Sequence, residues 1–111
     1  MTDVACSLQS PVLRISLSGP FDRFASVKVP EYIKRYRTSQ YSQIIIDLSC
    51  VSIVDSAGVD LLFLLSRIMR MKGGQLILLN PQAHVRDMLS RTDISNLAKI
   101  TCDPDSTLTA A

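Results

Sequence analysis

One serine stands out as a residue that could carry chemistry. Ser56 follows Asp55 at the end of an apolar stretch and precedes Ala57, Gly58 and a long apolar segment. The run Ile44–Leu48 is largely apolar and rich in β-branched residues, which predicts a strand covered on both faces. The periodic segment after Ser56 predicts a helix, with Ser56 as its N-cap. Because a helix start offers free N–H groups and a partial positive charge, a group there can carry or receive an anion.

A serine nucleophile is the enzymatic alternative. The segment Val54–Gly58 lacks the first glycine of a nucleophile elbow. His84 is the only histidine and thus the only imidazole base, and it stands at the start of a predicted short helix, where surface histidines are common. We therefore expect that the chain is not an enzyme and that Ser56 is not a catalytic nucleophile.

Composition narrows the classes of protein further. The 111 residues are enough for one domain with a real core, and 47% hydrophobic with 20% charged residues is ordinary for a soluble protein. No segment has the length of a membrane span, and the N-terminus does not resemble a signal peptide. A net charge of +2 does not favour nucleic-acid binding. Three widely spaced cysteines, Cys6, Cys50 and Cys102, predict neither a disulfide framework nor a metal site and fit a reducing cytoplasm.

Hydrophobic periodicity and turn residues predict the remaining elements. Alternation over Val12–Ser18 predicts a strand near a sheet edge that Gly19-Pro20 ends. Around Pro30 the pattern is weaker, and because proline interrupts helices we place it in the first turn of a helix over Pro30–Arg37. The basic cluster within that helix is interpreted as a solvated face. The other predicted elements are strands at Val4–Leu8, Gln75–Leu79 and Ala98–Thr101, a helix at Ala83–Ser90, and a brief helix or frayed end from Asp105.

The alternation of strands and helices predicts an α/β fold. We expect a single domain over residues 1–111, with a mixed, largely parallel sheet of four to five strands packed against about four helices. On a helical wheel the central helix has a core face formed by Leu61, Leu62, Leu65, Ile68 and Met69. Phe63, Leu64 and Met71 fall among its charges, with Val59 at the margin. Either other helices cover this second apolar face, or it is an exposed patch beside Ser56 that a partner binds.

Two motifs carry a resemblance to a known family. The segment Val51-Ser-Ile-Val-Asp-Ser-Ala-Gly58, preceded by Ile44-Ile-Ile-Asp-Leu-Ser49, resembles the STAS family of bacterial anti-sigma factor antagonists. Leu17-Ser-Gly-Pro-Phe-Asp22 resembles the turn that follows the first long strand in that family. Gly73-Gly-Gln-Leu76 and Asp93-Ile94 add agreement at the expected spacing, so the resemblance covers nearly the whole chain.

The resemblance implies a partner switch. In such proteins a GHKL-type serine kinase, which is also the anti-sigma factor, binds the unphosphorylated antagonist and releases its other partner. Phosphorylation of the serine, here Ser56, blocks that binding, and a serine phosphatase resets the cycle. The family also implies a monomer in the free state. From the residues themselves we expect no cofactor, because no phosphate-binding glycine loop is present, and no membrane insertion. Partner-binding positions are then Asp22, Asp55, Ala57, Gly58, Val59, Asp60, Phe63 and Leu64.

Two departures from the family pattern keep the output open. Asp60 and Cys50 stand where glycines are common, and Asp60 is expected to add negative charge to the first helical turn. We therefore expect that partner specificity differs from that of the sigma-factor systems. Two alternatives keep the fold: a partner switch with an output other than a sigma factor, and a STAS regulatory subunit of a transport ATPase.

Overall fold

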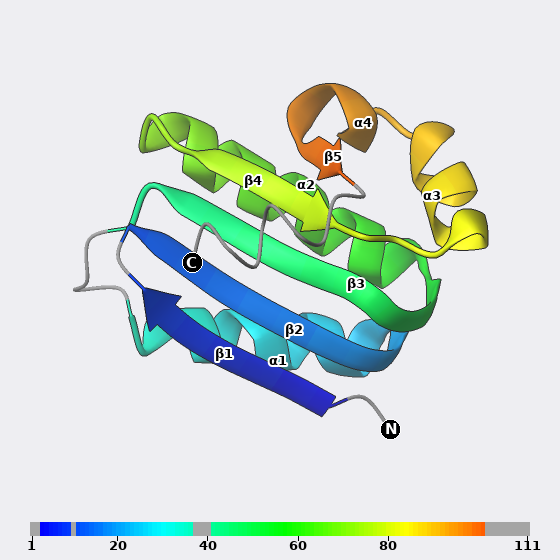
Figure 1. Ribbon diagram of the computed structural model, residues 1–111, viewed down its shortest axis with the longest axis horizontal. Coiled ribbons are helices and arrows are strands. Elements are labelled where there is room, and N and C mark those ends of the chain that lie inside the picture. Colours follow the sequence, from blue (N-terminus) through cyan, green and yellow to red (C-terminus); the bar gives the residue numbers. More distant parts are fainter. Residues whose placement is uncertain (1–2, 10, 37–40, 102–111) are drawn as a thin grey trace.

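Five strands lie side by side in the order in which the chain forms them, β1-β2-β3-β4-β5 (Figure 1). The structure is a computed structural model that describes residues 3–9, 11–36 and 41–101. Strand β1 pairs antiparallel with β2, and the pairs from β2 to β5 are parallel, which confirms the predicted mixed, largely parallel sheet. The strands are β1 Asp3–Gln9, β2 Val12–Phe21, β3 Gln43–Val54, β4 Gln75–Leu79 and β5 Lys99–Thr101.

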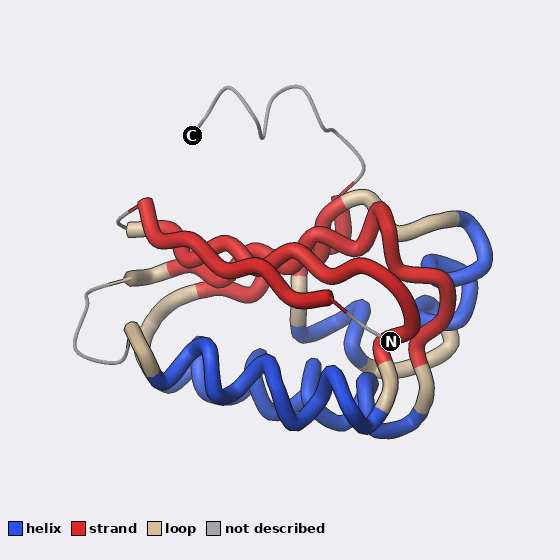
Figure 2. The backbone as a smooth tube through the Cα atoms, turned by 90° about the horizontal axis from the view of Figure 1, so that it is seen from below, coloured by secondary structure: helices blue, strands red, loops and turns tan. Residues whose placement is uncertain are grey.

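Helices cover one face of this sheet (Figure 2). Helices α1 and α2 lie next to each other across β2, β3 and β4, α4 packs beside α2, and α3 lies at the end of β3. The helices are α1 Arg23–Lys34, α2 Ser56–Met71, α3 Ala83–Ser90 and α4 Ile94–Leu97. The predicted helix at residues 83–90 is confirmed, as are the predicted strands, although β3 continues six residues beyond the predicted end at Leu48. The end predicted from Asp105, together with Cys102, lies outside the described residues.

Strand β2 is longer than predicted, because Gly19-Pro20 does not end it. Strand β1 begins with Asp3 opposite Ser18, so among the described residues β2 pairs only with β3 from Gly19 onward. Gly19 has a φ of +102°, a conformation open to glycine, and the register shifts between Gly19 and Phe21. A bulge thus absorbs the glycine and proline, and the strand continues to Phe21.

Helix α1 was also placed wrongly, since it begins at Arg23 and contains Pro30 in its interior. The Asp22 carboxylate accepts a hydrogen bond from the Ala25 N–H at 3.2 Å, which forms the first turn. An interior proline lacks one helical hydrogen bond and costs about 3 kcal/mol. Burial of Ala25 and Val29, both 0% exposed, against the sheet offsets that cost.

The core lies between the sheet and helices α1 and α2. Leu13 and Ile15 of β2 and Ile44 and Ile46 of β3 point into it, as the strand patterns predict. On α2, the predicted core face is confirmed for Leu61, Leu62, Leu65 and Met69, whereas Ile68 remains 38% exposed. Ile68 lies at the edge of the buried arc, about 100° from Met69 around the helix, so it contacts solvent rather than the sheet.

Candidate functional site

The end of β3 projects past its neighbour β4. Pairing with β4 stops at Asp47 and Leu79, whereas pairing with β2 continues until Val54 lies opposite Phe21. The stretch Val51–Val54, beyond the predicted strand at Ile44–Leu48, is therefore strand as well. Because β2 and β3 end together, the two helices that follow them also start next to each other, at the same end of the domain (Figure 1).

Side chains from α3 hold the free edge of this β3 extension. Gln82 Nε2 donates to the Ser49 carbonyl at 3.1 Å, and His84 Nε2 hydrogen-bonds the Ser52 carbonyl. The strand that leads to Ser56 is thus bonded on one side to β2 and on the other to the start of α3. Sequence reasoning missed both side chains, since nothing in their local pattern indicates a contact some thirty residues away along the chain.

An aspartate caps each of the two adjacent helices. The Asp55 carboxylate accepts from the Gly58 N–H at 3.0 Å, as Asp22 does from Ala25 in α1. The N-cap of α2 is therefore Asp55, and the prediction that Ser56 is the cap is wrong. Aspartate and serine are both favoured caps, so residue preference alone does not separate two neighbours. Ser56 is instead the first helical residue, and it is exposed.

Gly58 fixes how closely α2 approaches the sheet. A Cβ atom at this position would lie 2.6 Å from the Phe21 carbonyl oxygen and 2.9 Å from Val54 Cγ1. The same carbonyl accepts a hydrogen bond from the Asp55 N–H at 3.2 Å. Gly58 is buried, so its part in any partner surface is to set the position of the turn that carries Ser56.

The outward face of α2 continues from Ser56 through Asp60 and Leu64. Asp60 is exposed but lies one turn beyond Ser56, so it is not in the first helical turn as expected. Of the second apolar face, Val59 and Phe63 are half-buried against the core, whereas Leu64 is 49% exposed. Part of this face is thus packed against the core and part of it is exposed. Ala57 is half-buried.

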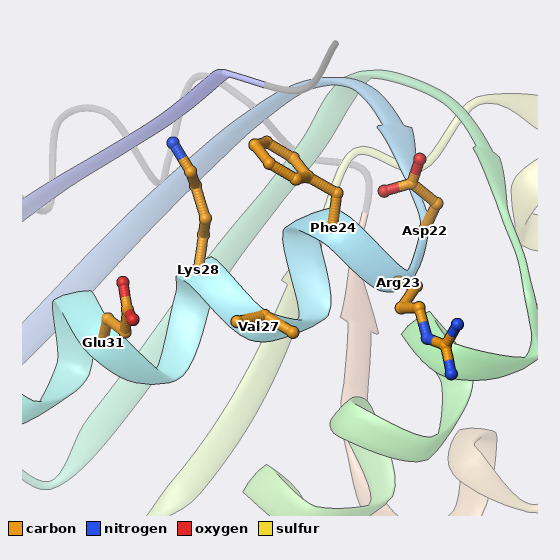
Figure 3. A pocket seen from close by; sticks show the side chains of 6 residues that line it. All are labelled: Asp22, Arg23, Phe24, Val27, Lys28 and Glu31. Atoms are coloured by element: carbon orange, nitrogen blue, oxygen red, sulfur yellow. The ribbon is translucent and has the colours of Figure 1, made fainter.

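The start of α1 adds an apolar depression to the same end of the domain. An open cavity of about 620 Å³ begins at Asp22 and follows the outer side of the helix, and Figure 3 shows the side chains that line it. Phe24 is 43% exposed, and Lys28 Nζ lies 4.8 Å from the centroid of its ring. Arg23 extends away from both, on the side of α1 that faces α2. Sequence reasoning missed this surface because it placed the helix several residues too late.

Three aspartates lie at the end of the domain that carries Ser56, together with the Arg23 cation at the start of α1. Asp55 precedes Ser56, Asp60 follows it by one turn, and Asp22 caps the adjacent helix. Within the described residues none of the three aspartates takes part in an ion pair. Ile53, 57% exposed and three residues before Ser56, adds an apolar side chain that its strand pattern alone did not mark as exposed.

Other candidate chemistries find little support in the geometry. The His84 ring nitrogen bonds a backbone carbonyl, and no hydrogen bond between described residues joins it to the Ser56 hydroxyl. Over residues 3–9, 11–36 and 41–101 no group of three or more metal-ligating side chains is assembled, and no helix there is long and apolar enough to cross a membrane. Cys6 and Cys50 are free thiols, and burial raises the pKa of Cys6 while Arg35 opposes the shift.

Comparisons with known proteins agree with this architecture. The family model for the STAS domain matches residues 6–106, and the chain therefore belongs to the STAS family. The sheet of five strands, mostly parallel, with four helices among the described residues, is the fold of that family.

Solved structures with the same fold come from bacteria and from an animal. The Bacillus cell-fate determinant and anti-sigma factor antagonist SpoIIAA matches in its unphosphorylated form with a TM-score of 0.77, at 20% identity over 97% of this chain and 96% of that one. Its phosphorylated form matches with a TM-score of 0.75, at 20% identity over 98% and 100%. An anti-sigma factor antagonist from Mycobacterium paratuberculosis gives 0.81, at 19% identity over 99% and 93%. The murine anion transporter Slc26a9 gives 0.74, at 20% identity over 94% of this chain and 18% of the transporter. At these identities the likeness concerns the fold.

Proposed function

We propose that this protein is a partner-switching regulator controlled by phosphorylation of Ser56. The unphosphorylated form binds a GHKL-type serine kinase that also acts as an anti-sigma factor, and that binding releases the kinase's other partner. A serine phosphatase restores the binding form. The observation that carries the proposal is that Ser56, the first residue of α2, is exposed. Its position is fixed by the Asp55 cap and by the β3 extension, which is hydrogen-bonded on both sides.

The charge around Ser56 explains how one phosphate acts as a switch. Phosphorylation adds about −1.5 to −2 charges, and the positive end of α2 helps the free protein to accommodate them. At a docked interface the phosphate would meet a partner surface already facing Asp22, Asp55 and Asp60. Since a loss of only about 1.4 kcal/mol lowers affinity tenfold, modest repulsion is enough. The fold of the free protein need not change, a view supported by the comparable similarity to SpoIIAA in both forms.

The same logic assigns the partner-binding surface. Asp22, Asp55, Asp60 and Leu64 present exposed or half-exposed side chains around Ser56, and Ala57, Val59 and Phe63 form the apolar margin. Gly58 acts beneath them through its close packing on Phe21. We place the protein in the cytoplasm, where such a kinase and its ATP are found, and we assign it no enzymatic activity of its own.

Phosphorylation by the host's GHKL-type serine kinase tests the proposal. With ATP, the wild-type protein should gain one phosphate by intact-mass measurement, and Ser56→Ala should gain none. Ser52→Ala is the matched control, because Ser52 is also exposed and lies on the same β3 extension. Phosphoprotein and Ser56→Asp should bind the kinase at least about tenfold more weakly than Ser56→Ala. Equal affinities of Ser56→Ala and Ser56→Asp would contradict the proposed switch.

The second candidate is regulation of a transport protein. The structural similarity to part of an anion transporter supports it. Such a role does not depend on a kinase that recognises Ser56. A pull-down from the host separates the two functions: a GHKL-type kinase among the bound proteins supports the switch, and a transport ATPase or transporter in its place supports the alternative. Labelling by a fluorophosphonate probe would contradict the absence of serine-enzyme activity.

A further inference from the structure

The exposed face of α2 is complementary to itself when it is turned end for end. Six residues on this helix fall within an arc of about 100° around its axis, at about 100° per residue. They form three pairs placed symmetrically about the point between Phe63 and Leu64. The pairs are Ser56 with Met71, Asp60 with Arg67, and Phe63 with Leu64.

Five of these residues are exposed, and the sixth, Phe63, is half-buried. Leu64 is 49% and Met71 82% exposed, and Asp60 and Arg67 are also exposed. Within the described residues neither Asp60 nor Arg67 takes part in an ion pair. Helix α2 therefore presents, along one line, two exposed apolar side chains and two opposite charges that pair with no charged group among the described residues.

From this pattern we infer that two copies of the chain associate through their α2 helices, packed antiparallel around a two-fold axis near Leu64. The axis makes the interface isologous, so each contact occurs twice. Leu64 of one copy packs on the Phe63–Leu64 region of the other at the usual interhelical distance of about 8–10 Å. Asp60 of each copy faces Arg67 of the other, and Met71 of each covers Ser56 of the other.

The size of this contact sets its strength. One helix face on each side is at the small end of specific interfaces, so the association is weak and concentration-dependent. The inference departs from the free monomer that the family resemblance implies. It also adds a consequence for Ser56, because the dimer covers the hydroxyl and a charged group there opposes association.

Sedimentation equilibrium of the unmodified protein over a range of concentrations tests the inference without any kinase. The wild-type protein should show a reversible monomer–dimer equilibrium that Leu64→Glu abolishes. Phe24→Glu is the matched control, because Phe24 is a similarly exposed apolar residue (43%) on α1 rather than α2, and it should leave the equilibrium unchanged. A protein that remains monomeric up to its solubility limit would overturn the inference, and so would a dimer that Leu64→Glu leaves intact.

Charge reversal tests the pairing itself. Asp60→Arg and Arg67→Asp should each weaken association about tenfold, because symmetry turns two attractive contacts into two repulsive ones. The double variant should return to within about threefold of the wild type. Glu31→Arg, on the exposed face of α1, should have no comparable effect. A double variant that is no better than the single variants would overturn the Asp60–Arg67 contact. Because all of these measurements use unphosphorylated protein alone, their failure would leave the proposed switch untouched.

Discussion

Helices α1 and α2 begin in the same way and yet differ in what their first turns can do. Each starts directly after one of two paired strand ends, Phe21 and Val54, and each is capped by an aspartate. The third residue after the cap, Ala25 in α1 and Gly58 in α2, donates its N–H to the cap carboxylate. At the first helical position α1 has Arg23 and α2 has Ser56.

The first turn of α1 serves the packing of the core, whereas the first turn of α2 presents the Ser56 hydroxyl at the surface. In α1 the residue after the cap is a long cation, and the methyl group of Ala25 is buried in the core. In α2 the first turn lies so close to the end of β2 that only glycine fits at position 58, and the residue after the cap is a short hydroxyl. The tight packing holds the Ser56 hydroxyl on a backbone with little freedom to move.

The largest predicted effect comes from the third position of each turn. Gly58→Ala should lower the free energy of unfolding by about 3 kcal/mol, because a backbone carbonyl 2.6 Å away from the new Cβ cannot give way as a side chain can. Ala25→Gly should cost about 1 kcal/mol from helix propensity and a little more from the lost buried methyl group. Chemical denaturation of both variants measures the difference. Equal losses would show that the two turns pack alike.

The two caps should contribute about equally to stability. Asp22→Ala and Asp55→Ala should each lower the free energy of unfolding by about 1 kcal/mol. Asparagine keeps the acceptor oxygen and removes the charge, so Asp22→Asn and Asp55→Asn should recover most of that loss. The same denaturation experiments provide the measurement. A large loss in only one of the two alanine variants would mean that one carboxylate has a role other than capping.

The sequence predicted the strands better than it predicted where α1 begins and which residue caps α2. The largely apolar runs at Ile44–Leu48 and Gln75–Leu79 identified the central strands, although among the described residues helices cover only one face of the sheet. The start of α1 was missed because Pro30 was treated as a helix boundary, whereas the Asp22 cap and the burial of Val29 outweigh it. The identity of the α2 cap depends on which carboxylate or hydroxyl reaches the Gly58 N–H, and that is a matter of backbone geometry.

Some features of the candidate site follow from the local sequence, and others depend on contacts between distant residues. The position of Ser56 at a strand–helix junction follows from local pattern, and its exposure was expected. Asp22 lies beside the start of α2 because Phe21 pairs with Val54. That contact joins residues some thirty positions apart, so local periodicity does not predict it. The contacts of Gln82 and His84 with the β3 extension are of the same long-range kind. The partial exposure of Ile68 depends on how deeply α2 sits between α1 and α4.

The smallest effects are expected at the first helical positions, where they are the most informative. Ser56→Asp and Arg23→Asp each place a carboxylate at a helix start, which the helix dipole favours by about 0.3–1 kcal/mol. Beside Asp55 or Asp22, repulsion between the carboxylates offsets part of that gain, so both variants should lie within about 0.5 kcal/mol of the wild type. Thermal unfolding at low and moderate salt measures this, and added salt should reduce the difference further. If Ser56→Asp were strongly destabilising while Arg23→Asp was not, a phosphate at Ser56 would act by disturbing the fold. Near-equal stabilities would show that a charge at Ser56 leaves the fold intact and acts on partner binding. The two helix starts would then differ in recognition rather than in folding.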